Sequence, residues 1–186
     1  LKKFPDKIVI PLLMFFDDFE CNNPLGTHAG VYKIGGVYFS IAGVPPKYWS
    51  RLENIFLLAL FHSSDRGSYG NRAVFKDILK QFQNLEQDWV PIKTKNGVVR
   101  VHLPLLLILE DNLGINSVTG FTKSFNSNYF CRFCTLSKEE CKAVCSETDI
   151  NSIRTLENYK VHCLDNSYGI KEECIFNDLS SFHCIT

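Results

Sequence analysis

The sequence predicts an α/β fold, in which a mixed sheet with flanking helices is followed by a small cysteine-rich part. Two long apolar runs, Ile8–Glu20 and Val101–Asn112, each end in acidic residues. A strongly helical pattern lies between them in the chain. Seven of the eight cysteines fall within residues 131–186, so the composition changes near the end of the sequence.

The first apolar run predicts a strand that is buried on both faces in the middle of a sheet. A half-exposed strand would alternate apolar and polar residues, and this run does not. Asp17 and Asp18 are expected where the strand leaves the sheet, and the second run ends similarly in Glu110 and Asp111. Ligands of open α/β sheets bind at that edge. Carboxylate oxygens gathered there would suit a divalent metal ion.

The segment after the first run contains several short elements. Residues 27–41 hold two β-like pieces around Gly35 and Gly36, a glycine pair typical of a hairpin or a bulge. Residues 52–62 fit either a helix or a buried strand by periodicity. Gly67 and Gly70 are expected to end this element in a loop that carries Asp65 and Arg66.

The clearest helix is predicted over residues 71–89, where apolar residues recur at three- and four-residue spacing. Asn96 and Gly97 then predict a hairpin over residues 92–101. The second acidic run follows this hairpin. Short helices are expected after it, over residues 117–125, 139–147 and 153–161.

Composition and charge limit the possible classes of protein. Hydrophobic residues make up 45% of the 186 residues, which suits one domain with a real core, with or without a small appendage. The chain carries 20 Lys and Arg and 20 Asp and Glu, so binding to nucleic acid would need a local basic patch or another domain. No signal peptide is recognisable, and no apolar run approaches the ~20 residues that span a bilayer. We expect an intracellular protein with no membrane partner.

Cys131 and Cys134 form a CxxC motif, which supplies half of a tetrahedral zinc site. A clustered CxxC without a secretory signal favours an intracellular metal site, and disulfides in a secreted protein are the alternative. A redox pair is less expected, because no thioredoxin-like context surrounds the motif. The later cysteines could instead be free, partly buried thiols. The second pair of zinc ligands is left open among Cys141 with Cys145, His162 with Cys163, and Cys174 with His183.

The order of the elements resembles that of ribonuclease-H-like folds, in which several strands, a helix and a further strand follow one another. Acids on the first and fourth strands of such folds meet at one side of a mixed sheet. Asp17 and Asp111 hold these positions here. The alternative is structural, since acids that follow strands are common in turns and as helix caps.

Four motifs taken together are similar to transposases of the CACTA (En/Spm) type, and more narrowly to invertebrate transposon-derived proteins related to them. The order and spacing of the motifs, which span most of the chain, carry the resemblance. The motifs are FFDDFECNNPLG, VPPKYWSRLENIFLLALFHSSDR, LEDNLGINSVTGF and YFCRFC.

The resemblance implies a ribonuclease-H-like core in which three acids hold two Mg²⁺ or Mn²⁺ ions, cleave phosphodiester bonds and join a 3′-hydroxyl to another strand. By position, Asp17 is the first acid, Asp18 is its competitor for that role, and Asp111 is the second acid. The third, a Glu, should follow the Phe182–His183 stretch, and no match lies before Thr186. We therefore expect a fragment of a longer protein.

The domains implied are a partial catalytic core over residues 1–128 and a zinc-bearing insertion over residues 129–186. The implied partner is DNA at transposon ends, bound through regions outside this chain. A nuclear location and a homo-oligomer are also implied. The alternative function is a non-catalytic module, derived from a decayed or domesticated transposon, that keeps the fold and the zinc.

Overall fold

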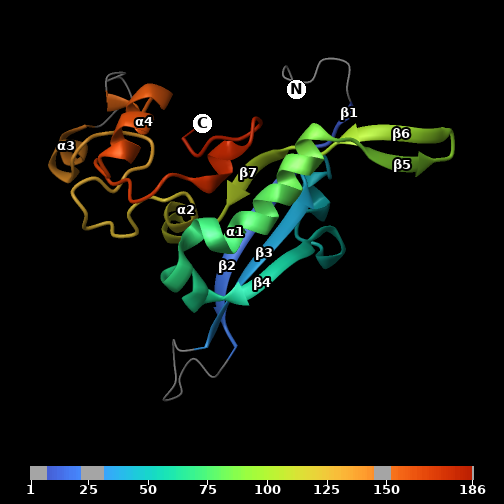
Figure 1. The fold of residues 1–186 in the computed structure, drawn as a ribbon, viewed down its shortest axis with the longest axis horizontal. Coiled ribbons are helices and arrows are strands. Elements are labelled where there is room, and N and C mark those ends of the chain that lie inside the picture. Colours follow the sequence, from blue (N-terminus) through green and yellow to red (C-terminus); the bar gives the residue numbers. More distant parts are fainter. Residues whose placement is uncertain (1–7, 22–31, 145–151, 186) are drawn as a thin grey trace. The chain divides into compact units, whose positions relative to one another are not determined.

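The structure is a computed structural model that describes residues 8–21, 32–144 and 152–185 (Figure 1). The chain divides into two compact units. Unit 1 comprises Leu1–Glu110 and Asp178–Phe182, and unit 2 comprises Asp111–Asn177 and His183–Thr186. Two mixed sheets and several helices make up the described residues, which confirms the predicted α/β class. None of the described helices is both long and apolar enough to cross a membrane.

A four-stranded sheet forms the centre of unit 1. Its strands are β2 (Leu12–Glu20), β3 (Lys33–Ile41), β4 (Phe56–His62) and β7 (Leu105–Leu109), in the order β4-β3-β2-β7. The pairs β2–β3 and β3–β4 are antiparallel, whereas β2 and β7 are parallel. The two apolar runs of the sequence therefore supply neighbouring parallel strands.

A second sheet contains β1 (Ile8–Val9), β5 (Val90–Thr94) and β6 (Gly97–His102) in the order β1-β6-β5. Each apolar run is divided between the two sheets at a proline, Pro11 in the first and Pro104 in the second. Proline has no N–H to continue a ladder, so β1 ends before β2 begins and β6 ends before β7 begins.

The hairpin predicted over residues 92–101 is confirmed as β5–β6. Thr94 pairs with Gly97, so the two turn residues are Lys95 and Asn96, one position earlier than the Asn-Gly pair suggests. Gly97 has a φ of 117°, a conformation that favours glycine.

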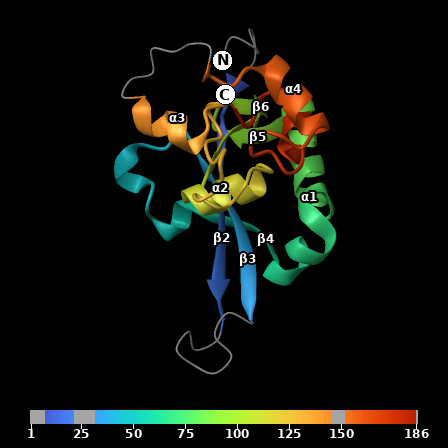
Figure 2. The same ribbon diagram turned by 90° about the vertical axis from the view of Figure 1, so that its left-hand side faces the viewer.

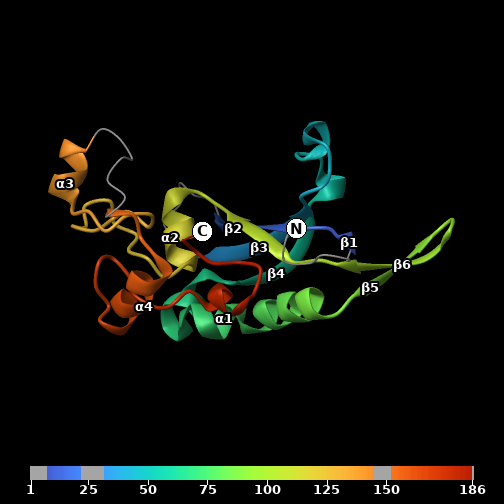
Figure 3. The same cartoon turned by 90° about the horizontal axis from the view of Figure 1, so that it is seen from above.

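The predicted helix over residues 71–89 is confirmed, but the helix starts earlier. Helix α1 spans Ser63–Gln87, so it includes Asp65 and Arg66, for which a loop was expected. Gly70 has φ 78° and ψ 168°, which are not helical angles, so α1 consists of two helical segments joined by a kink at this residue. The apolar face of α1 covers one face of the four-stranded sheet (Figure 2, Figure 3).

The glycine pair Gly35–Gly36 does not form a hairpin, because β3 runs straight through it. A Cβ on Gly35 would lie 2.5 Å from the ring of Phe61 and 3.1 Å from that of Phe16. Those rings stack across the glycine with their centres 5.9 Å apart, and Phe75 of α1 meets both edge-on. The glycine thus makes room for an aromatic cluster that joins α1 to the sheet.

Residues 52–62, which fitted a helix or a strand, contain a short 3-10 turn, η2 (Leu52–Asn54), and then β4. A similar turn, η1 (Pro46–Tyr48), precedes them. The pairing of β3 with β4 shifts register between Val37 and Tyr38, one residue beyond the glycine pair that predicted a bulge.

Burial on both faces was predicted for the two acidic strands and is wrong. In β2, Met14 and Phe16 are buried, whereas the alternating Leu13 and Phe15 are only half-buried. In β7, Leu106 is 53% exposed. Helix α1 covers one face of the sheet, and the apolar residues of the other face keep contact with solvent.

The described residues of unit 2 form three short helices, α2 (Asn112–Val118), α3 (Lys138–Ala143) and α4 (Leu156–Leu164), and a 3-10 turn, η4 (Ile175–Asp178), begins there. Helix α2 ends where a helix was expected to begin at residue 117. The other two helices overlap the predicted ranges, and residues 145–147 of the first range lie outside the described residues. Both α3 and α4 begin with a capping box.

Candidate functional site

Asp17 and Asp18 lie inside strand β2 rather than where it leaves the sheet. They pair with Gly36 and Gly35 of β3, whereas the pairing with β7 ends at Phe15. The expected position at the strand end is therefore wrong, because β3 continues the sheet beyond the end of β7. Neighbouring residues of a strand face opposite sides. Asp18 shares the α1 face with Phe16, and Asp17 lies on the other face.

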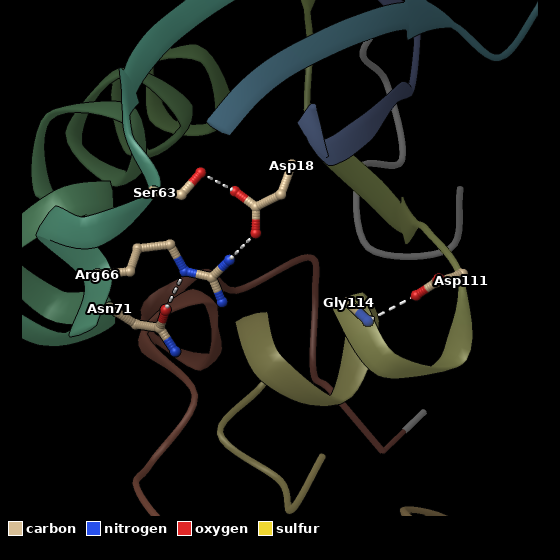
Figure 4. Close-up of polar contacts among 6 residues, drawn as sticks. All are labelled: Asp18, Ser63, Arg66, Asn71, Asp111 and Gly114. Atoms are coloured by element: carbon tan, nitrogen blue, oxygen red, sulfur yellow. Dashed lines mark hydrogen bonds and ion pairs between the residues drawn. The ribbon is translucent and has the colours of Figure 1, made fainter. Parts of the chain in front are cut away.

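Asp18 is held in a polar network at the start of α1 (Figure 4). The hydroxyl of Ser63 donates a hydrogen bond to Asp18 Oδ1, and Arg66 Nη1 lies 3.5 Å from Asp18 Oδ2. Arg66 Nε in turn donates to Asn71 Oδ1 at 3.1 Å. The Arg66 side chain is only 9% exposed, and its guanidinium carbon lies 4.6 Å from the centre of the Phe16 ring. Asp18 therefore has a structural partner, Arg66, that no local sequence pattern predicts.

Asp17 has a different environment. It is exposed, and its carboxylate makes no hydrogen bond or ion pair with any of the residues that the structure describes. Its backbone is fixed by the β2–β3 ladder opposite Gly36. Of the two adjacent acids, Asp17 is thus the one with a carboxylate available for a ligand.

Asp111 is the first residue of unit 2 and the N-cap of α2. Its Oδ1 accepts a hydrogen bond from the Gly114 N–H at 2.7 Å, as Figure 4 shows. Asp111 thus has the helix-capping role that the sequence analysis gave as the structural alternative to metal binding. The residue is exposed, and its Oδ2 has no hydrogen bond within the described part of the chain. One carboxylate oxygen therefore caps the helix while the other is accessible.

The CxxC motif forms a tight, half-buried loop in unit 2. The Phe133 N–H donates to Cys131 Sγ at 3.4 Å. Burial raises the pKa of Cys134 to about 11, with smaller contributions from the nearby Cys131 and Cys141, while the Leu136 N–H acts in the opposite direction. The Phe133 N–H thus points at the sulfur of Cys131, and the Leu136 backbone favours the thiolate of Cys134.

Arg154 holds the backbone of this loop. The residue is only 4% exposed, and burial lowers the pKa of its guanidinium, although the nearby thiols oppose this. Its side chain occupies the inside of the loop and fixes the loop conformation, a role that sequence reasoning missed. The guanidinium donates to backbone carbonyl oxygens of Cys131, Arg132, Cys134 and Tyr168 at 3.0–3.3 Å.

The remaining candidate zinc ligands divide between two surroundings. His162 Nδ1 lies 3.3 Å from Arg154 Nη1, and its ring stacks on Tyr168 with 4.1 Å between centres. Cys163 and Cys174 lie around Tyr159 instead. The chain also brings Cys184 to this second group, a residue that the sequence-based ligand set omitted. Side-chain hydrogen bonds join Cys184 to Cys174 and to Tyr159, and the His183 ring meets Tyr159 edge-on at 5.2 Å.

Among the residues that the structure describes, no group of three or more His, Cys, Asp or Glu side chains is arranged to hold a metal ion. Cys145 lies outside the described residues. The zinc shell around Cys131 and Cys134 and the metal site at the acids both remain predictions. No protein-family model and no curated protein matches the chain.

Proposed function

We propose that this chain is part of a DNA transposase-like enzyme with a ribonuclease-H-like core, related to the CACTA type, in which Asp17 and Asp111 are ligands of a divalent metal. The supporting observation is the pairing of β2 with β7. The two strands run parallel, and Phe15 lies opposite Leu109. Asp17 follows Phe15 by two residues, and Asp111 follows Leu109 by two residues.

Asp17 is a better candidate for the first acid than Asp18. The carboxylate of Asp18 already accepts from Ser63 and faces Arg66, so a metal ion would have to displace the arginine. Asp17 is exposed and rigidly placed by the ladder to β3. A metal ligand needs both an accessible oxygen and a fixed backbone.

Carboxylate oxygens are the hard ligands that Mg²⁺ and Mn²⁺ prefer, so these residues fit such an ion. When bound, a divalent ion would activate an attacking oxygen and stabilise a leaving oxygen of a phosphodiester. The residues of the chain hold the site in position, because the pair of Asp18 and Arg66 fixes this part of β2 against α1. The same proposal includes DNA transposon ends as the partner, action in the nucleus, and assembly into a homo-oligomer.

We extend the proposal to zinc at Cys131 and Cys134. The support is the Phe133 N–H that points at the sulfur of Cys131 and the buried arginine that fixes the loop. Cys141 contributes to the raised pKa of Cys134 and is our candidate third ligand, although the described side chains are not arranged as a group of three that could hold a metal ion. Cys145 is then the natural fourth ligand by sequence, four residues further along the chain.

A non-catalytic, zinc-containing interaction module is the second candidate. One observation favours it: Asp111 caps α2, which gives this acid a purely structural reason to be present. Under this alternative, Asp17 is an ordinary surface acid. The two candidates differ in whether both acids are needed for a divalent metal to bind.

Calorimetric titration with Mn²⁺ tests the proposal, with Asp17→Asn and Asp111→Asn as variants. Asparagine caps helices as well as aspartate does, so Asp111→Asn keeps α2 while it removes the charged ligand. We expect the wild type to bind Mn²⁺ and both variants to lose at least about tenfold in affinity. Equal binding by the wild type and Asp17→Asn would contradict the metal site and favour the interaction module.

A further inference from the structure

The β5–β6 hairpin concentrates positive charge in a chain that is neutral as a whole. Residues 89–102 contain Lys93, Lys95 and Arg100 and neither Asp nor Glu, whereas the full chain has 20 residues of each sign. All three cations are exposed. None of them forms an ion pair with an acid in the described part of the chain.

The register of the hairpin puts two of these cations on one face. Pro91 pairs with Arg100, and Lys93 pairs with Val98. Residues directly opposite each other share a face, and so do residues two apart on one strand. Lys93 and Arg100 therefore project from the same face, and Lys95 lies at the turn. The hairpin extends past the end of the four-stranded sheet (Figure 1, Figure 3).

An aromatic ring adjoins the charged face. The guanidinium carbon of Arg100 lies 4.1 Å from the centre of the Trp89 ring, and Trp89 is 43% exposed. Ile92 and Val98, both more than a third exposed, add apolar surface on the hairpin. Cations beside an accessible aromatic plane match a polymer that has both phosphates and flat bases.

We propose that the Lys93/Arg100 face of the β5–β6 hairpin binds the sugar-phosphate backbone of a nucleic acid. The absence of acids along residues 89–102 favours a polyanion, and the exposed ring beside Arg100 favours nucleic acid over an acidic peptide. The choice of DNA as the nucleic acid rests on the function proposed above. The contacts are to phosphates, so they give affinity without sequence preference.

The test is fluorescence anisotropy with a labelled DNA duplex in EDTA, so that binding does not depend on a metal ion. The double variant Lys93→Ala/Arg100→Ala is compared with the wild type and with Lys76→Ala/Lys80→Ala, which removes two exposed lysines from α1 of the same unit. Each lost phosphate contact reduces the slope of log K against log salt by about 0.9. We expect a slope about 2 smaller and at least about tenfold weaker binding at 0.1 M salt for the hairpin variant, and wild-type values for the control.

Equal loss in the two double variants would overturn the proposal, because it would indicate general attraction by surface charge. No DNA binding by the wild type, or tighter binding to an acidic peptide or to anionic vesicles, would overturn it as well. The metal-site proposal fails separately, through the Mn²⁺ titration of Asp17→Asn. If the hairpin binds DNA but the protein binds no Mn²⁺, the result would support the DNA-binding hairpin and contradict the metal site at Asp17 and Asp111.

Discussion

Arg66 pairs with Asp18 on the α1 face of the central sheet, with 3.5 Å between Nη1 and Oδ2, while the adjacent Asp17 faces the other side. Two neighbouring acids of one motif thus have different surroundings. Strand alternation places Asp17 and Asp18 on opposite faces of the sheet. The first segment of α1 places Arg66 beside Asp18 only. This division of roles underlies the assignment of Asp17 as a metal ligand and of Asp18 as a structural residue.

Asp18→Asn should destabilise unit 1, because it removes the negative charge that the nearly buried guanidinium of Arg66 faces. The pair is worth about 1–2 kcal/mol once the 37% exposure of the Asp18 side chain is allowed for. Urea denaturation measures the loss. The matched control is Asp17→Asn, for which we expect a change within about 0.5 kcal/mol. Equal effects of the two substitutions would contradict the division of roles.

Gly35→Ala should destabilise unit 1 by about 1–3 kcal/mol, since a Cβ there would meet the Phe61 ring at 2.5 Å. The rings of Phe16 and Phe61 stack across this position and cannot both stay in place. Gly43→Ala is the control, because nothing lies within 4 Å of its Cβ position. A urea midpoint for Gly35→Ala that matches the control would show that the aromatic cluster does not depend on the glycine.

Arg154→Lys should destabilise unit 2 by about 2–4 kcal/mol. The planar guanidinium donates hydrogen bonds to four carbonyl oxygens, and a lysine ammonium cannot reach all four. A buried carbonyl oxygen that loses its donor lowers the stability of the fold. Thermal unfolding followed by circular dichroism gives the comparison. Arg51→Lys, at an exposed ion pair with Glu53, should change little. An unaltered melting temperature for Arg154→Lys would argue against its role as the centre of the loop.

Purified protein should contain about one zinc ion per chain, and Cys131→Ser should remove it. Zinc binds the thiolate, and the pKa of Cys134 is raised to about 11 by burial, so zinc must displace a proton and should bind more tightly at pH 8 than at pH 6. Atomic emission on wild type and variant measures the content, with Cys21→Ser as the control at an exposed cysteine of unit 1. Equal zinc in all three proteins would rule out the CxxC as a ligand pair.

The regular elements of unit 1 were largely predictable from sequence. The period of α1 and the hairpin signal at Asn96 depend on local spacing, which a single sequence displays. The path of β3 through Gly35 was not predictable, because the reason for that glycine is the ring of Phe61, which comes from a different strand. The helical segment before Gly70 was not predicted, because Gly67 has a low helix propensity, whereas the predicted helix over residues 71–89 begins directly after the kink at Gly70.

The candidate sites were predictable only as sets of residue types. The sequence shows two adjacent acids after an apolar run, but strand alternation within β2 and the position of Arg66 decide which one is accessible. In unit 2 the CxxC was evident, whereas the buried arginine behind it carries no local signal. The contact of Cys184 with Cys174 is produced by the fold, so no sequence pattern indicates it. Treating every cysteine of residues 131–186 as a candidate ligand would have included Cys184.

The central claim is that one divalent ion is shared by Asp17 and Asp111, and paramagnetic broadening in nuclear magnetic resonance tests it most directly. One equivalent of Mn²⁺ should broaden the backbone amide signals of both residues together, and Asp17→Asn should restore both. Sharp signals at Asp17, or broadening at Asp111 that persists unchanged in Asp17→Asn, would contradict a shared ion.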